Sequence, residues 1–306
     1  MDESESSARP DESASAARPD ESEPSTVALP DGRVLSYATC GDPEGEPVFC
    51  FHGVVGSRLT WSLCDEVATE RGIRVVAPDR PGFGASDFQR GRRLLDWPAD
   101  VAALADHLGV DSFGVAGFSG GGPHAMACAH ELPGRVRGVS LVSTVTPPET
   151  RDRADPFNES VLAATRFVPG FSRAAFATAA WLAKHDRERL RASLRASAAP
   201  PDRALIDGPV GDLLVADVAE GFRRGSRGPA HDLPMVGNDW GFDVGAVDVP
   251  VTLRHGRADG TVGIELARAF ADLLPAADLY VTDEAHYSTY VGGREAVLAG
   301  ALSEPL

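Results

Sequence analysis

The stretch FGVAGFSGGG, residues 113–122, decides how this chain folds. Its apolar first half predicts a buried strand from Phe113 to Gly117, and the residues after it predict a helix from Gly122 to His130. Between them, Ser119 lies in a G-x-S-x-G turn, where side chains two residues before and after the serine would collide, so glycine is needed at both places. Such a turn lifts the hydroxyl clear of the backbone. Ser119 is therefore a candidate nucleophile.

The same turn predicts where negative charge would be stabilised. It places the amide of Gly120 at the N-terminus of the predicted helix, where a developing oxyanion is favoured. Five residues of this kind also occur in glycine-rich turns with a purely structural role. The catalytic interpretation therefore depends on partners elsewhere in the chain.

A second glycine-containing segment is HGVVGS, residues 52–57, which directly follows the apolar run Val48 to Phe51. A loop at the carboxyl end of such a strand can turn a backbone N–H toward the nucleophile. We expect the amide of Val54 to be this second donor, with Val55 as the alternative. His52 is predicted to orient the loop by hydrogen bonds, because the catalytic base follows the serine and the acid in chain order.

The acid and the base are found downstream in that order. A strand predicted at residues 251–254 is followed by a loop that contains Asp259, and one predicted at 278–282 is followed by His286. Because the carboxyl ends of parallel strands share one edge of a sheet, both can converge on Ser119. Asp283 and Glu284 are alternative acids, although so short a loop cannot readily aim them at the imidazole. The structural alternative is that Asp259 only caps the helix after it and His286 is a surface residue.

The rest of the chain alternates short apolar runs with helical patterns, which predicts crossover units and a mostly parallel sheet flanked by helices. Apolar residues at Val101, Leu104, Ala105 and Leu108 follow the spacing of a helix that lies on a sheet. Further strands are expected at residues 34–39, 48–51, 74–77 and 136–142, and further helices at 60–70, 96–108 and 264–274.

Composition shifts divide the chain into three parts. Residues 1–25 contain the unit ARPDES twice, with acids in excess and no aromatic residue, and are predicted to be a disordered acidic tail. Residues 147–240 interrupt the strand and helix alternation and predict helices near 159–167, 172–184, 186–197 and 210–222. So long an insertion is better explained as a cap than as a loop. Residues 26–146 and 241–306 form the expected core.

The 306 residues have a formal net charge of -16, which argues against a nucleic-acid or anionic-membrane partner. The apolar stretches are too short for a transmembrane helix, and the acidic first residues are unlike a signal peptide, so a cytoplasmic protein is expected. No histidine or cysteine spacing indicates a metal site, and no glycine-rich nucleotide motif indicates a cofactor. The expected partner is a small-molecule substrate. The oligomeric state is left open.

Taken together, these segments resemble the α/β-hydrolase fold superfamily, and within it the lid-bearing serine hydrolases such as esterases, lactonases, haloperoxidase-like enzymes and proline iminopeptidases. The segment DRPGFGASD, residues 79–87, matches the family's D-R-P-G-x-G-x-S loop and is interpreted as structural. Serine rather than aspartate at the elbow argues against epoxide hydrolase and haloalkane dehalogenase chemistry. Val-Val-Gly after Gly53 departs from the Gly-Pro-Gly of proline iminopeptidases. Gly263, where relatives often have proline, and Glu284-Ala285 before His286 are further departures.

The resemblance implies an α/β-hydrolase fold with an inserted helical cap and a serine hydrolase that cleaves a carboxylic ester, lactone or related acyl compound. Ser119, Asp259 and His286 would form the catalytic triad, and the amides of Val54 and Gly120 the oxyanion hole. An amide or C–C bond hydrolase on the same triad, and a non-catalytic scaffold that binds a small ligand, remain alternatives. Aromatic residues of the cap are expected to form its core, with a role in lining the pocket as the alternative: Phe157, Phe167, Phe171, Phe176 and Trp181.

Overall fold

The computed structural model describes residues 23–153 and 170–303. Its strands are β1 (Ser25–Ala28), β2 (Val34–Gly41), β3 (Glu46–Phe51), β4 (Ile73–Pro78), β5 (Phe113–Phe118), β6 (Val136–Val142), β7 (Val251–Gly256) and β8 (Ala277–Thr282). Within the described ranges these strands form one sheet in the order β1-β2-β4-β3-β5-β6-β7-β8. Pairing is antiparallel for β1 with β2 and β2 with β4, and parallel from β4 through β8.

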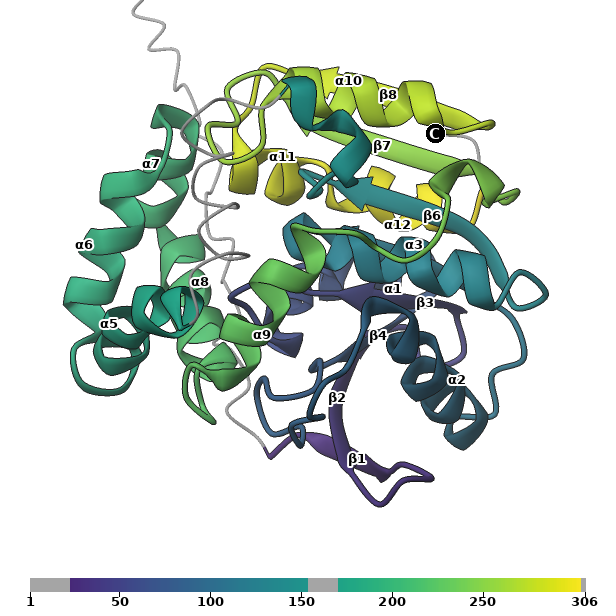
Figure 1. Cartoon of the computed structure of the whole chain (residues 1–306), viewed down its shortest axis with the longest axis horizontal. Helices are drawn as coiled ribbons and strands as arrows, with labels where there is room; N and C mark the ends of the chain where they lie inside the picture. Colours follow the sequence, from purple (N-terminus) through teal and green to yellow (C-terminus); the bar gives the residue numbers. More distant parts are fainter. Residues whose placement is uncertain (1–22, 154–169, 304–306) are drawn as a thin grey trace, which may run out of the picture.

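Helices flank the sheet on both faces (Figure 1). They are α1 (Asp65–Glu70), α2 (Trp97–His107), α3 (Gly122–Glu131), α10 (Ile264–Leu273), α11 (His286–Gly292) and α12 (Arg294–Ala301), with a 3-10 segment η1 (Arg58–Cys64) after β3. Because successive strand residues point to opposite faces, Phe49 and Phe51 join the cluster under α2, α3 and α10, while Val48 and Cys50 join the cluster under α1 and α12. The predicted stripe on α2 is confirmed, since Val101, Leu104 and Ala105 are buried.

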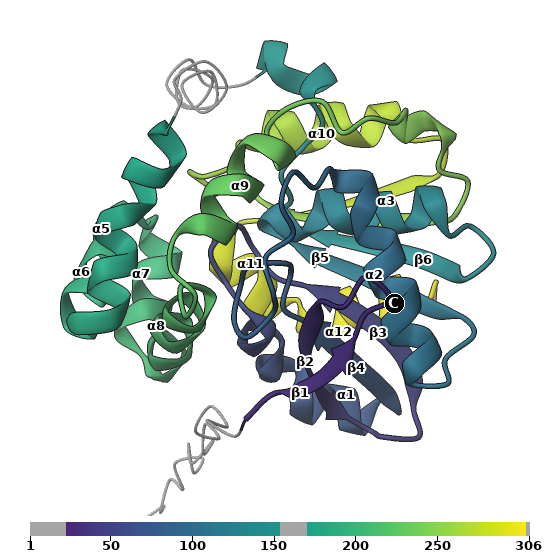
Figure 2. The ribbon, with the colours of Figure 1, turned by 60° about the horizontal axis from the view of Figure 1, so that its bottom comes forward.

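A helical insertion lies between β6 and β7, as the sequence predicted. It contains the 3-10 segment η4 (Pro148–Arg153) and the helices α5 (Phe171–His185), α6 (Arg187–Ser197), α7 (Pro200–Asp207), α8 (Pro209–Gly221) and α9 (Arg227–Val236). Helices α5 to α8 gather to one side of the sheet, and α9 runs between them and the core (Figures 1 and 2). The helix expected near residues 159–167 lies outside the described residues.

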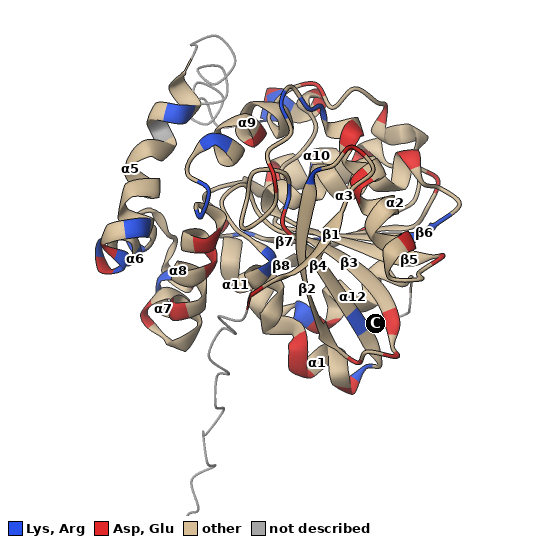
Figure 3. Cartoon of the chain, turned by 90° about the horizontal axis from the view of Figure 1, so that it is seen from below, with Lys and Arg blue, Asp and Glu red and all other residues tan. Residues whose placement is uncertain are grey.

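Several elements were not expected from the sequence, among them helices α9 and α12. Strand β1 begins at Ser25, the last residue of the predicted tail, and pairs Val27 with Leu35. Helix α7 fills the segment between the predicted helices 186–197 and 210–222, and α11 begins at His286 itself. Acidic and basic residues are interspersed over the core and the insertion (Figure 3), and Arg195 of α6 pairs with Asp207 of α7 at 2.8 Å.

Candidate active site

Ser119 lies at a strained turn between β5 and α3. Its φ angle is +52°, a left-handed conformation that residues with a side chain rarely adopt, and the residue is half-buried. The structure confirms that glycine is needed on both sides of Ser119, because a side chain at either place would collide with backbone atoms. A Cβ on Gly117 would lie 2.6 Å from Cα of Gly122, and one on Gly121 would lie 2.7 Å from the carbonyl carbon of Phe51. Both obstacles are backbone, so neither can move aside.

Replacing Gly117 with alanine is therefore expected to lower the free energy of unfolding by about 1–3 kcal/mol, the usual cost of overpacking a rigid site. Gly134 is the matched control, because a Cβ there would meet nothing within 4 Å. Gly134→Ala should change stability by less than about 1 kcal/mol. Urea unfolding monitored by fluorescence measures both. Equal unfolding midpoints for the two variants would contradict the packing argument.

Asp259 and His286 meet at the carboxyl ends of β7 and β8. Nδ1 of His286 donates to Oδ2 of Asp259 at 2.8 Å, and each residue is 6% exposed. The other carboxylate oxygen accepts the amides of Thr261 at 2.8 Å and Val262 at 2.9 Å, which fixes the loop after β7. Asp259 thus holds its own loop, as the structural alternative expected, and contacts the histidine as well.

The electrostatics favour an ionised carboxylate. Burial by itself raises the pKa of Asp259, but the neighbouring His286 and the hydrogen bonds outweigh burial and hold the pKa below its usual range. An ionised Asp259 accepts the proton of Nδ1, so the lone pair of neutral His286 lies on Nε2. The alternative acid Asp283 points away, because its side chain is 97% exposed and pairs with Arg257.

Two contacts place His286 relative to the serine turn. Its ring lies 5.1 Å from the ring of Phe118, the residue before Ser119. Its carbonyl accepts a hydrogen bond of 2.9 Å from the hydroxyl of Ser143, which follows β6 and has a φ of +47°. This role of Ser143 was not predicted from the sequence. The described structure thus joins Asp259 to His286 and brings both to the edge where β5 ends.

The loop after β3 lies directly beside the serine turn. A Cβ on Gly53 would lie 3.5 Å from Cβ of Ser119, and one on Gly120 would lie 3.0 Å from the amide nitrogen of Val54. The side chain of Val55, the residue whose amide is the alternative donor, packs against the hydrophobic cluster of the insertion. The two backbone amides named from the sequence, those of Val54 and Gly120, therefore belong to neighbouring segments.

His52 has the orienting role that the sequence predicted. Its Nε2 accepts the amide of Arg80 at 3.1 Å and its Nδ1 donates to the carbonyl of Gly53 at 2.9 Å. Burial, followed by the charge of Arg80, lowers its pKa well below the ordinary value, so the ring is neutral. His124, left open by the sequence, packs under the turn: it is fully buried and its Nδ1 lies 2.9 Å from the carbonyl oxygen of Gly120.

The expected aromatic core of the insertion is only partly found. The buried cluster consists of Ala183, Leu190, Val215, Val218 and Phe222, and Phe176 packs against it. Trp181 is 55% exposed, so its assignment to this core was wrong. Its position on α5 turns it toward solvent, where it contacts the ring of His185 at 5.2 Å. Phe157 and Phe167 lie outside the described residues.

Two buried carboxylates of the insertion were not predicted from the sequence: Asp217 on α8 and Asp232 on α9, which are 5% and 0% exposed. Burial raises the pKa of Asp217 to about 7.

In residues 23–153 and 170–303 no helix is long and apolar enough to cross a membrane. The same ranges contain no group of three His, Cys, Asp or Glu side chains that could hold a metal ion.

Comparison with known proteins agrees with this architecture. The model of the alpha/beta hydrolase fold family matches residues 46–291. A non-heme chloroperoxidase of Streptomyces lividans is 30% identical over 272 residues, or 83% of this chain and 89% of the relative. A solved hydrolase from Pseudomonas aeruginosa PA01 has a TM-score of 0.69 at 21% identity and covers 92% of this chain and 98% of its own. The enol-lactonase from Burkholderia xenovorans LB400 has a TM-score of 0.67 at 17% identity, covering 92% and 100%. The chain therefore belongs to the alpha/beta hydrolase fold family.

Proposed function

We propose that the protein is a serine hydrolase that cleaves carboxylic esters, lactones or related acyl compounds. The observation that supports this most strongly is the buried hydrogen bond of 2.8 Å between Asp259 and His286. It lies at the same sheet edge as Ser119, whose strained turn matches a nucleophile elbow. A structural role alone would not need a histidine, a carboxylate and a serine on a strained turn at one edge of the sheet.

The arrangement would work in two stages. The hydroxyl of Ser119 attacks the acyl carbonyl while Nε2 of His286 takes the proton, and Asp259 stabilises the imidazolium that forms. The amides of Val54 and Gly120 donate to the oxyanion of the tetrahedral intermediate. His286 then gives its proton to the leaving oxygen, which departs and leaves an ester of Ser119. Water attacks this ester in the second stage, with His286 again as the base, and releases the acid.

The family resemblance is compatible with several acyl substrates. One structural neighbour is named an enol-lactonase, and a lactone presents to the serine the same carbonyl as an open ester. Both require a nucleophile, a base and two oxyanion donors, and nothing more. The common step is acylation of Ser119, so a test of that step does not depend on the natural substrate.

Reaction with a fluorophosphonate probe tests the proposal directly. We expect one adduct on Ser119 in the native chain, because the probe phosphonylates serines activated by a neighbouring base, with loss of fluoride. Ser119→Ala should lose the adduct. The matched control Ser193→Ala, at an exposed position on α6, should keep it. Intact mass followed by peptide mapping measures both.

A folded native protein that forms no adduct would overturn the proposal and favour the non-catalytic scaffold. An adduct on a different serine would overturn the assignment of Ser119. Once the adduct is mapped, a panel of p-nitrophenyl esters of different acyl length, lactones and aminoacyl anilides would separate esterase, lactonase and amidase activity by their kcat/KM values.

A further inference from the structure

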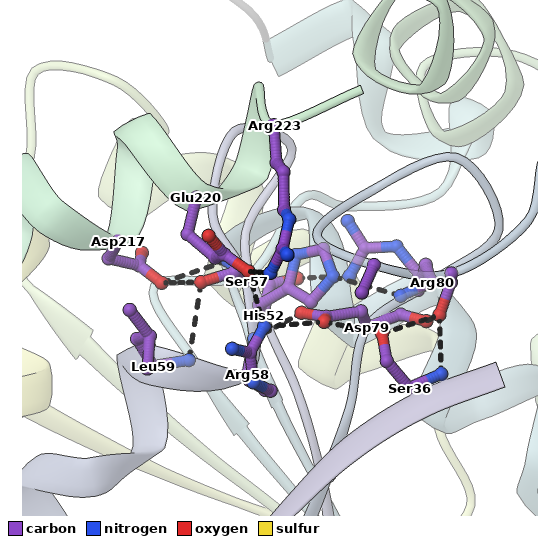
Figure 4. Close-up of polar contacts among 12 residues, drawn as sticks. Ser36, His52, Ser57, Arg58, Leu59, Asp79, Arg80, Asp217, Glu220 and Arg223 are labelled. Atoms are coloured by element: carbon purple, nitrogen blue, oxygen red, sulfur yellow. Dashed lines mark hydrogen bonds and ion pairs between the residues drawn. The ribbon is translucent and has the colours of Figure 1, made fainter. Parts of the chain in front are cut away.

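Two helices of the insertion reach the loop at residues 52–57 through buried carboxylates. Asp217 of α8 contacts one end of this loop, and Asp232 of α9 contacts the other end through an arginine. Figure 4 shows Asp217 beside Ser57 at the left of the cluster, Arg80 at the right and His52 between them. The loop between these two ends contains Val54, whose amide is one of the proposed oxyanion donors.

At the N-terminal end of the loop, Arg80 holds the carbonyl of Gly53. Arg80 follows β4 and is fully buried, and its Nη2 donates to the oxygen of Gly53 at 2.7 Å. Its Nη1 donates to the carbonyl of His52, and its Nε donates to Asp232 at 2.8 Å. Arg92 pairs with the second oxygen of Asp232. Charge-assisted bonds of this kind are strong and directional, so the Gly53 carbonyl has little freedom to rotate.

Fixing this carbonyl also fixes an amide. The C=O of Gly53 and the N–H of Val54 belong to one planar trans peptide unit, in which the two groups point in opposite directions. Any rotation that moves one moves the other. Because the nitrogen of Val54 lies beside Gly120, the guanidinium of Arg80 sets the direction of a donor at the serine turn. A cation on the carbonyl also polarises the peptide and strengthens its N–H as a donor.

At the C-terminal end of the loop, Asp217 holds Ser57. One carboxylate oxygen accepts both the amide and the hydroxyl of Ser57 at 2.8 Å, and the other accepts the hydroxyl of Thr60 at 2.8 Å. Helix α8 approaches so closely that a Cβ on Gly221 would lie 3.1 Å from the nitrogen of Gly56. No chain segment can fit between the helix and the loop here. The loop is therefore fixed by the insertion at both ends.

We propose that the insertion positions the oxyanion donor of the core. Asp232 acts through Arg80 on the Gly53–Val54 peptide, and Asp217 acts through Ser57 on the far end of the same loop. Asp232, Arg80 and Asp217 are therefore positioning residues, which act through the loop. The proposal rests on the hydrolase function proposed above. It assigns the insertion a part in the chemical step.

Two substitutions of Asp217 test one end. Asp217→Ala removes every acceptor for Ser57, and we expect kcat for p-nitrophenyl acetate to fall roughly 10- to 100-fold with KM changed less than about threefold. An oxyanion donor acts on the transition state, which is why kcat falls and KM does not. Asp217→Asn keeps an amide oxygen for Ser57 and should restore kcat to within about fivefold of the native value.

Arg80→Lys tests the other end. Lysine keeps the positive charge beside Asp232, but its three donors lie on one nitrogen. They cannot replace the planar fork in which Nε, Nη1 and Nη2 of Arg80 reach the carboxylate and the two carbonyls separately, so kcat should again fall roughly 10- to 100-fold at nearly constant KM. Asp212→Ala is the matched control. Asp212 lies on the same helix as Asp217, is exposed and pairs with Arg191 of α6, so its loss should leave both constants unchanged. Circular dichroism and melting curves verify that each variant is folded.

The outcomes separate this inference from the function on which it rests. A native chain that neither reacts with the fluorophosphonate nor cleaves the ester overturns the proposed function, and this inference with it. A reactive native chain together with folded Asp217→Ala and Arg80→Lys variants of native kcat overturns the inference alone. So does a loss confined to KM. If Asp217→Ala does not fold, Ser57→Ala replaces it. For that variant we expect kcat to fall about tenfold.

Discussion

Replacing Ser119 with alanine is expected to lower kcat/KM for p-nitrophenyl acetate by at least about 10⁴-fold. The alanine lacks the nucleophile, and the activity that remains comes from the oxyanion donors and substrate binding alone. The melting temperature should change little, because the half-buried hydroxyl of Ser119 is replaced by a side chain with the same Cβ. Steady-state kinetics with matched melting curves measure both quantities.

A second substitution at the same place tests the strain in the turn. Ser119→Gly also lacks the hydroxyl and should be as inactive as Ser119→Ala, but its melting temperature should be higher. A φ of +52° costs a residue with a Cβ about 1–3 kcal/mol, and glycine adopts it freely. Activity retained by either variant would mean that another group is the nucleophile. Equal melting temperatures would contradict the strain.

The parts of the fold that depend on local pattern could be predicted from the sequence. Residues 113–117 are apolar and small, the stripe from Val101 to Leu108 has helical spacing, and both appear as expected. The meeting of Asp259 with His286 followed from topology, because strands that run in parallel end at one edge of the sheet. No pairwise contact had to be known in advance.

The parts that depend on distant contacts could not be predicted. Asp217 interrupts an apolar helix, and Ser57, which it contacts, is 160 positions away in the chain. A carboxylate on an apolar helix face was the available signal, but its partner could be found only from the folded chain. Helix α11 was missed for a different reason. Its sequence HYSTYVG is rich in β-branched, aromatic and glycine residues, and tertiary packing overrides this poor helix propensity.

Trp181 shows the opposite error, because residue type alone was used to place it in the core of the insertion. Large aromatic residues are usually well buried, and a small helical unit needs apolar contacts to fold. In the structure smaller residues such as Ala183 and Val215 provide those contacts. Whether a residue of α5 lies in this core or in solvent depends on the direction in which the helix presents its side chain. That direction is set by its neighbours α6, α8 and α9.

Replacing Asp259 with asparagine is expected to lower kcat/KM about 10³- to 10⁴-fold at pH 7–8, close to the effect of losing the nucleophile. The amide oxygen can still accept the backbone donors of Thr261 and Val262, so the loop after β7 keeps its shape. The amide nitrogen, however, donates toward Nδ1 of His286. This forces the ring proton onto Nε2, where the lone pair that takes the serine proton is needed.

The pH dependence of stability provides an independent check on the same substitution. In the folded chain the pKa of Asp259 is held below its ordinary value of 3.8. The ionised carboxylate therefore stabilises the fold fully at pH values above 3.8. This contribution is lost as the pH falls through the lowered pKa. The stability difference between the native chain and Asp259→Asn should therefore shrink below about pH 4. Asp283 is the exposed alternative acid. Asp283→Asn should therefore have the activity and the pH dependence of stability of the native chain. If Asp283→Asn were inactive and Asp259→Asn active, the carboxylate that orients His286 would have to be the exposed one. The buried hydrogen bond would then serve stability only.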